Sequence, residues 1–298
     1  MSKPLAMVTT EFLDRPGLAA STVRSYEFTL LPLLQQYGQW SLELLDRQTL
    51  EEYLNSLSHL SFKTHHRHQA ILQALLNFAV EQGYLRSNPM TRMKRRKPDP
   101  AKGEHDSDQI IRYLTPDQLQ LQYQLVSKDA RTAALVRLLH RTGARISELL
   151  SLDLEALDLE QRKFQVIGKG NRQRWCFYSE DAAEVLQKYL AEYRHPGSPA
   201  LFTAQQYLSD QVNRLSYRSA HHNWKQLIKG HPTLAGTRLH DLRHTFATER
   251  VGIIALEELR ALMGHQSIQT TLRYQKVTSE QAQNAAQRAF DKLSQTTL

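Results

Sequence analysis

Apolar residues recur at helical spacing along the first ninety positions, so this part of the chain is predicted to be helical. STVRSYEFTLLPLLQQYG begins at Ser21, a favourable N-cap, and Pro32 is expected to kink or split that helix. RQTLEEYLNSLS is a second amphipathic segment, and SFKTHHRHQAILQALLNFAVEQG is a third that should stop at Gly83. The pattern predicts an N-terminal helical domain over residues 1–88.

The composition changes directly after this helical region. RSNPMTRMKRRKPDPAKGEHDSDQ carries three prolines, and from Arg86 to Lys102 seven basic residues stand against one acid, Asp99. With little to bury, residues 89–110 are interpreted as an extended linker whose basic run can lie along phosphates. The alternatives are a charged linker that binds nothing and a localisation-type basic tract.

A second domain is predicted over residues 111–298. Thr115 and Pro116 mark the start of one helix, and DARTAALVRLLHRTG should form another that ends at Gly143, with ISELLSLDL continuing as a third. KFQVIG and QRWCFY alternate like strands on either side of Gly168–Asn171, which predicts a hairpin. Further helices are expected over Asp181–Tyr193, Tyr207–Lys229, Asp241–Gly252, Leu256–Met263, Ser267–Tyr274 and Ser279–Leu293. The predicted fold is mainly α with a small antiparallel β-sheet.

The net charge of the chain indicates which kinds of binding partner it favours. The 298 residues carry a formal net charge of +8, and the sequence pI is about 9.5, which favours nucleic acid or an anionic membrane, although solubility alone is the simpler alternative. No stretch approaches the roughly 20 apolar residues of a membrane span, and no signal peptide is recognisable. One cysteine, Cys176, rules out an intrachain disulfide framework and a multi-cysteine zinc site. We expect a cytoplasmic, nucleoid-associated protein.

Two groups of polar residues are weak candidates for a metal site. The acids of SLDLEALDLE mix helix faces and have no histidines near them in the sequence, so a solvated surface is favoured over a two-metal nuclease site. In KTHHRHQ, His65 and His68 share a helix face, but no third ligand is evident. A basic helix end that contacts DNA is the preferred interpretation.

Stronger candidates lie in the second domain. Arg145 follows the helix-ending glycine with Glu148 three residues later, and Lys169 occupies the hairpin turn. In LHDLRHTFAT, His240 and Arg243 share the face of a helix start, and in LMGHQS a helix ends beside His265. Taken singly, each residue has an ordinary structural interpretation. Arg145 and Glu148 could form a surface ion pair, Lys169 could lie in a solvated turn, the two histidines could cap helices, and Tyr274 could be a packed aromatic.

As a set, these residues suit metal-free phosphoryl transfer. Arginine forks neutralise non-bridging oxygens with directional donors, and lysine or histidine can protonate a leaving alkoxide. A tyrosine with an ordinary pKa of about 10 becomes a nucleophile when guanidinium groups favour its phenolate and a histidine accepts its proton.

The segments TGARISELLSL, GKGNRQR, LHDLRHTFAT and GHQSIQTTLRY, in that order, resemble the tyrosine recombinases, the phage-integrase family. The size and two-domain layout are most similar to Xer-type or transposon-encoded members. The resemblance implies that Tyr274 attacks the scissile phosphate to form a 3′-phosphotyrosine, without ATP or a metal. It further implies roles for the other positions: Arg145 and Arg243 clamp the phosphate, Lys169 protonates the 5′-oxygen, His240 assists proton transfer, His265 hydrogen-bonds the phosphate, and Glu148 holds the site in place.

The resemblance also implies the partners. Members act as tetramers on double-stranded DNA sites with inverted repeats and pass through a Holliday junction, either alone or with a partner recombinase. The helix over residues 279–293 is expected to dock into a neighbouring subunit; packing on its own domain is the alternative. Basic side chains that could contact DNA are Lys63, His66, Arg67, Lys94, Arg95, Arg96, Lys97, Arg172 and Arg174.

Two other functions remain open at this point. A type IB topoisomerase shares the nucleophile and the cationic site but relaxes DNA without a special target, and the small N-terminal helical domain favours a recombinase. A DNA-binding module with a disused site would not need all six groups together.

Overall fold

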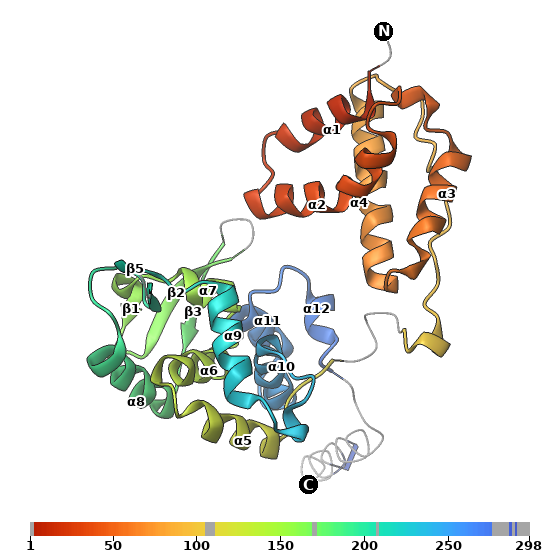
Figure 1. Ribbon diagram of the computed structural model, residues 1–298. Helices are drawn as coiled ribbons and strands as arrows, with labels where there is room; N and C mark the ends of the chain where they lie inside the picture. Colours follow the sequence, from red (N-terminus) through yellow and green to blue (C-terminus); the bar gives the residue numbers. More distant parts are fainter. Residues whose placement is uncertain are drawn as a thin grey trace. The chain divides into compact units, whose positions relative to one another are not determined.

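A computed structural model describes residues 3–104, 111–168, 172–206 and 209–275, together with Ala286, Gln287 and Phe290. The chain divides into two compact units, residues 1–109 and 110–298. Helices dominate both units, as predicted, and the strands form small antiparallel sheets in the second (Figure 1).

The first unit is a group of helices around its own apolar core. Its elements are α1 (Leu5–Asp14), α2 (Ala20–Tyr37), η1 (Leu42–Leu44), α3 (Arg47–Ser56), η2 (Leu57–His59), α4 (Phe62–Glu81) and η3 (Pro100–Lys102). Leu33, Leu75 and Leu76 are completely buried in this core. The helix starts follow capping chemistry, since Asp46 accepts the backbone N–H of Thr49 at the start of α3.

The predicted split at Pro32 is wrong, because α2 runs as one helix from Ala20 to Tyr37, and a kink at Pro32 stays a prediction. A proline at this position removes the bond to the carbonyl of Phe28, four residues earlier. Both Phe28 and Pro32 are exposed, so water can satisfy that carbonyl. The helix also begins before the expected cap, with Ala19 as N-cap and Ser21 inside the first turn.

Residues 89–104 pack against the first unit rather than standing free as an extended linker. Met90 is buried in the core of that unit. The ring of His66 hydrogen-bonds the carbonyl of Arg96 at 2.9 Å, and Arg96 donates to the carbonyl of Leu60 at 2.9 Å and pairs with Glu104 at 2.5 Å. Backbone and side-chain bonds to α4 and its preceding turn therefore hold the basic run in place.

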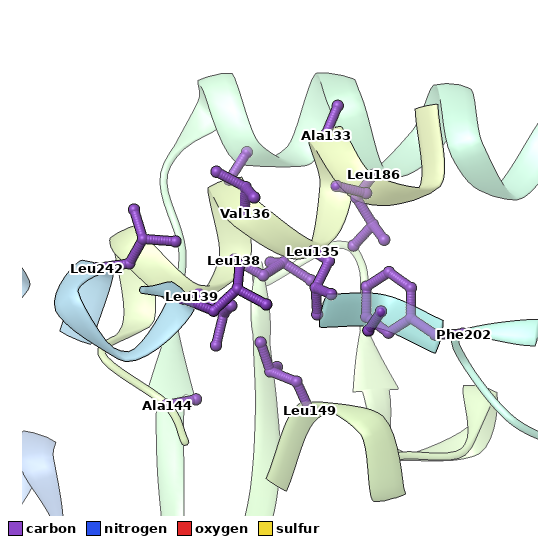
Figure 2. Close-up of a cluster of buried hydrophobic side chains, with 14 of the residues drawn as sticks. Ala133, Leu135, Val136, Leu138, Leu139, Ala144, Leu149, Leu186, Phe202 and Leu242 are labelled. Atoms are coloured by element: carbon purple, nitrogen blue, oxygen red, sulfur yellow. The ribbon is translucent and has the colours of Figure 1, made fainter. Parts of the chain in front are cut away.

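The second unit is built around α6, which is buried on most of its circumference. Its helices are α5 (Pro116–Val126), α6 (Ala130–Thr142), α7 (Ile146–Ser151), η4 (Leu154–Ala156), α8 (Glu180–Lys188), the π-helical turn η5 (Tyr189–Tyr193), α9 (Tyr217–Ile228), η6 (Pro232–Leu234), α10 (Leu239–Arg250), α11 (Leu256–Met263) and α12 (Ile268–Leu272). Figure 2 shows Leu135, Leu138 and Leu139 of α6 surrounded by side chains from α7, α8, α10 and the strand segment at Phe202. Thr115 and Pro116 begin α5 as predicted, with a capping box between Thr115 and Gln118.

The described part of the chain contains two antiparallel sheets, one more than predicted. The expected hairpin forms from β2 (Lys163–Ile167) and β3 (Gln173–Phe177), and β1 (Leu157–Asp158) adds a third strand. β4 (Thr203–Gln206) and β5 (Ser209–Arg214) form the second sheet, where a helix from residue 207 was expected.

The long helix expected over residues 207–229 is therefore wrong over residues 209–216, and α9 begins only at Tyr217. Tertiary contacts decide this segment: Arg214 donates to the carbonyls of Leu150 and Leu152, at 3.1 and 2.8 Å, just past the end of α7. The expected helix over residues 279–293 lies outside the described residues, apart from three isolated positions. In the described part of the chain, no helix is long and apolar enough to cross a membrane.

Candidate active site

The carboxylate of Glu148 organises one side of the site. Glu148 lies in the first turn of α7 and is 5% exposed. Its two oxygens accept a forked pair of bonds from Arg174 of β3, at 2.9 and 2.7 Å, and a third from Arg145 Nη1 at 2.8 Å. Burial opposes ionisation of Glu148, but the bonds from Arg174 and from the Arg145 backbone outweigh it and lower its pKa to about 2. Glu148 thus stays charged and aligns two guanidinium groups.

Helix α10 delivers three more polar side chains from consecutive turns of one face: His240, Arg243 and His244. Arg243 is 2% exposed. Its guanidinium donates to the carbonyl of Gly143 at the end of α6 and to that of Met263 at the end of α11, the latter at 2.5 Å. Burial, together with the charges of Arg145 and Arg174, lowers its pKa to about 10, so the group remains a cation at neutral pH.

His265 follows α11, which ends at Gly264 with a positive φ of 62°. Its backbone N–H bonds the carbonyl of Arg260 at 3.1 Å, and its Nδ1 lies 2.9 Å from Thr271 Oγ1. Burial and the nearby charges of Arg243 and Arg145 lower the pKa of His265 to about 3. The ring is therefore neutral at physiological pH.

Tyr274 lies just beyond α12, half-buried beside these histidines. Its ring is parallel to that of His265, with centroids 6.2 Å apart, and its hydroxyl is 2.8 Å from Nδ1 of His244. Burial raises the pKa of Tyr274, while the charges of Arg243, Arg273 and Arg145 act in the opposite direction. The arginines favour the phenolate as expected, but burial outweighs them, and the hydroxyl is protonated at neutral pH.

A cavity of about 540 Å³ opens beside these groups. Its lining includes four arginines, Arg145, Arg172, Arg174 and Arg260, together with His265. Several cations and the neutral ring of His265 surround one hollow, and the ring of Tyr274 stacks on His265. This arrangement suits an anion.

Most of the expected catalytic residues meet here. The structure brings together Arg145, His240, Arg243, His265 and Tyr274, and Glu148 bonds Arg145 of this group. Lys169 lies outside the described residues. The described residues beside its turn bond each other, with the Gly168 N–H donating to the carbonyl of Arg172 at 2.7 Å, and both line the cavity.

Two residues add to this picture. Arg174, predicted to contact DNA, is held by Glu148 and by the carbonyl of Leu262 at 3.0 Å, and it also lines the cavity. Its guanidinium supports the site, and its contact with DNA stays a prediction. His244 was not singled out from the sequence. Its position four residues after His240 on the same helix face is a signal that would have found it.

The other basic residues expected to contact DNA are mostly exposed. Arg172 is exposed at the end of the hairpin turn. In the first unit, Lys63, Lys94, Arg95 and Lys97 are also exposed, and Arg67 is exposed while donating to Ser25. His66 and Arg96 are partly buried by the bonds that hold the basic run on α4.

Comparison with known proteins agrees with this geometry. The family model described as the phage integrase family matches residues 112–281, more than half of the chain. The chain belongs to the phage integrase family. It is a tyrosine-type site-specific DNA recombinase, and its mainly helical fold with small sheets is the fold of that family.

Individual relatives of the chain are also tyrosine recombinases by name. Tyrosine recombinase XerC of Lactobacillus delbrueckii subsp. bulgaricus is 28% identical over 247 residues, covering 79% of this chain and 80% of the relative. XerC of Staphylococcus haemolyticus is 26% identical and covers 89% of both chains. Among solved structures, the Tn1549 transposon integrase in complex with a circular intermediate DNA is 20% identical, with a TM-score of 0.77 over 97% of this recombinase and 100% of that chain. XerH bound to its difH substrate has a TM-score of 0.68 at 20% identity, over 95% of this recombinase and 82% of that chain.

Proposed function

We propose that Tyr274 is the nucleophile of this recombinase and forms a 3′-phosphotyrosine while releasing a 5′-hydroxyl. The observation that carries the proposal is the position of Tyr274. Its hydroxyl hydrogen-bonds the neutral imidazole of His244, and the positive charges of Arg243 and Arg145 favour its phenolate. A phosphodiester held in the arginine-lined cavity would contact His265, whose ring stacks on that of Tyr274, and we infer that its phosphorus is then presented to the tyrosine hydroxyl.

The other groups of the site have separate roles at the bound phosphate. Arg145 and Arg243 neutralise the non-bridging oxygens, and His265 hydrogen-bonds one of them. Lys169 protonates the leaving 5′-oxygen, and His240 assists proton transfer around the tyrosine. Glu148 and Arg174 keep Arg145 aligned. Because the phosphotyrosine conserves the bond energy, an incoming 5′-hydroxyl can reverse the step without another energy source.

The proposed substrate is a duplex site with inverted repeats, bound by four subunits that exchange strands in two rounds through a Holliday junction. Support comes from the similar proteins, one described on a circular intermediate DNA and another on its difH site. A homotetramer and a tetramer with a partner recombinase are both compatible with this scheme. The segment 279–293 would dock on the neighbouring subunit.

The test is a covalent adduct with DNA. The target sequence is sought among duplexes that the protein retains from a random pool and among inverted repeats that flank its gene. Nicked suicide substrates are then made with these sequences. Wild type and Tyr193→Phe, which changes an exposed tyrosine, should give an adduct that survives denaturation, and Tyr274→Phe should give none. An adduct with Tyr274→Phe would refute the assignment. Specific binding without any adduct would indicate a binding module, and relaxation of plasmids that lack the site would indicate a topoisomerase.

A further inference from the structure

His244 contacts the nucleophilic oxygen but has no task in the scheme above. Its Nδ1 is 2.8 Å from Tyr274 Oη, and the two ring centroids are 5.7 Å apart. The other histidines of the site are turned to different partners: Nδ1 of His265 bonds Thr271, and the ring of His240 packs edge-on against His244 at 4.7 Å. Among the residues that the structure describes, His244 is thus the histidine that can exchange a proton directly with Tyr274.

We propose that His244 accepts the proton of Tyr274 during cleavage and returns it during rejoining, an inference that rests on the proposed function. In cleavage, the O–H bond of Tyr274 breaks as its proton moves to Nδ1 of His244. The tyrosine oxygen bonds phosphorus, the bond from phosphorus to the 5′-oxygen breaks, and that oxygen leaves with a proton from Lys169. Rejoining reverses each transfer, and the leaving tyrosine oxygen takes its proton back from His244.

The surroundings of His244 keep its imidazole in the accepting form. Burial, with the neighbouring His240, Arg238 and Arg243, lowers its pKa to about 4, against a smaller opposing effect of Asp241. The ring is therefore neutral at neutral pH, and in the tautomer with its proton on Nε2 it presents a lone pair at Nδ1. In the absence of DNA the pair stays uncharged, because burial also raises the pKa of the Tyr274 hydroxyl.

A bound phosphodiester changes this balance. Its negative charge would lie in the cationic cavity that His265 lines, and the ring of His265 stacks on Tyr274. That charge would stabilise the imidazolium that forms when His244 takes the proton. The nucleophile is thus activated where substrate is present and remains a hydrogen-bonded phenol elsewhere. His240 then assists the proton transfer indirectly, as a positioning residue, since its ring lies one helical turn earlier and packs edge-on against the His244 ring.

The test compares His244→Asn with wild type on two substrates. Asparagine keeps a polar atom near the position of Nδ1 and cannot titrate in this range. One substrate has the normal 5′-oxygen; the other has a bridging 5′-sulfur, which leaves without needing a proton. We expect His244→Asn to slow adduct formation by about 10²- to 10⁴-fold on both substrates, the usual range for loss of a positioned base. Lys169→Ala should be slow on the oxygen substrate alone.

Controls separate this role from folding and binding. His59→Asn makes the same change at an exposed histidine of the first unit and should cleave both substrates at the wild-type rate. Melting temperature and DNA affinity of His244→Asn should stay close to wild type. Strand joining to a 3′-p-nitrophenyl ester, whose leaving group needs no proton, should be equally fast in Tyr274→Phe and in Tyr274→Phe with His244→Asn.

Three outcomes would overturn the inference while leaving the proposed function standing. The first is cleavage by His244→Asn at the wild-type rate, and the second is full rescue of its defect by the 5′-sulfur substrate. The third is joining to the p-nitrophenyl ester that is slowed, in the double variant relative to Tyr274→Phe, as much as cleavage is slowed, which would show a structural role. If wild type forms no adduct on either substrate, the proposed function fails first and this inference fails with it.

Discussion

The carboxylate of Glu148 shows how one buried charge sets the geometry of the two arginines that it pairs with. It receives three side-chain bonds from Arg145 and Arg174 and a backbone bond of 2.7 Å from the N–H of Arg145. Without it, Arg145 would lose the bonds that fix both its backbone and its guanidinium, and Arg174 would be a buried cation without its counter-charge.

Replacing Glu148 with glutamine should therefore destabilise the protein and misplace Arg145. We expect Glu148→Gln to lower the free energy of unfolding by about 3 kcal/mol, as for other broken buried ion pairs, and to slow adduct formation. Urea unfolding measures the first effect. Glu155→Gln alters an exposed glutamate and should stay within about 0.5 kcal/mol of wild type. Equal stability of the two variants would contradict this account.

The buried histidines predict how stability depends on pH. The folded-state pKa of His265 is lowered to about 3 and that of His244 to about 4, both below the unfolded value near 6.5. The unfolded chain then binds more protons, so stability is full above about pH 6.5 and is lost as pH falls towards 4. The melting temperature should drop over this window, and less steeply in His265→Asn. A melting temperature that rises between pH 6.5 and 5 would oppose this assignment.

At the scale of elements, the ends of helices bring the site together. Gly143 ends α6 with φ of 62°, and its carbonyl accepts a bond from Arg243 of α10. A Cβ at this position would lie 2.4 Å from the Phe246 ring, also on α10. Gly264 ends α11 in the same backbone conformation, where a Cβ would lie 2.9 Å from the Arg174 side chain. Both glycines allow the close approaches on which the arginines depend.

Gly143→Ala should consequently cost more than backbone strain alone. The left-handed conformation costs about 1–2 kcal/mol for a side-chain-bearing residue, and displacement of Phe246 adds about 1–3 kcal/mol. Gly197→Ala is the matched control, because Gly197 has φ of 88° and nothing within 4 Å of the added Cβ. Chemical unfolding should show Gly143→Ala as the less stable of the two, with the larger loss of cleavage; the reverse order would exclude a role for the Phe246 contact.

At the scale of the whole molecule, each unit has its own apolar core, and basic residues are exposed on both. Bonds to α4 and its preceding turn hold the run that contains Lys94, Arg95 and Lys97, yet these three side chains remain exposed. A basic run that is ordered before DNA arrives loses less entropy on binding than a free linker would.

Replacing Lys94, Arg95 and Lys97 with alanine should weaken DNA binding on all sequences. The slope of log affinity against log salt should become shallower by about 0.9 for every phosphate that the variant no longer neutralises. Titrations of labelled duplex at several salt concentrations measure the slope. Lys128→Ala, at an exposed lysine between α5 and α6, should leave it unchanged. An unaltered slope in the triple variant would show that this run does not bind phosphates.

Local patterns in the sequence determined many of the elements and most of the candidate site. The caps at Thr115 and Pro116, the stop at Gly143 and the β2–β3 hairpin all follow from chemistry between near neighbours. The ordered motifs also indicated which residues belong to one site, because a metal-free phosphoryl-transfer site needs that set of groups.

Tertiary structure decided what depends on distant partners. β5 replaces the first part of the helix expected over residues 207–229, because it pairs with β4 and because Arg214 bonds carbonyls some sixty residues away. Arg174 of β3 bonds Glu148 of α7, which lies 26 residues earlier in the sequence. Burial, which no local pattern reports, raises the pKa of Tyr274, and the fold places the ring of His244, thirty residues earlier in the sequence, against its hydroxyl. Local sequence specifies backbone conformation and the kinds of groups present; packing decides which of them touch and which are charged.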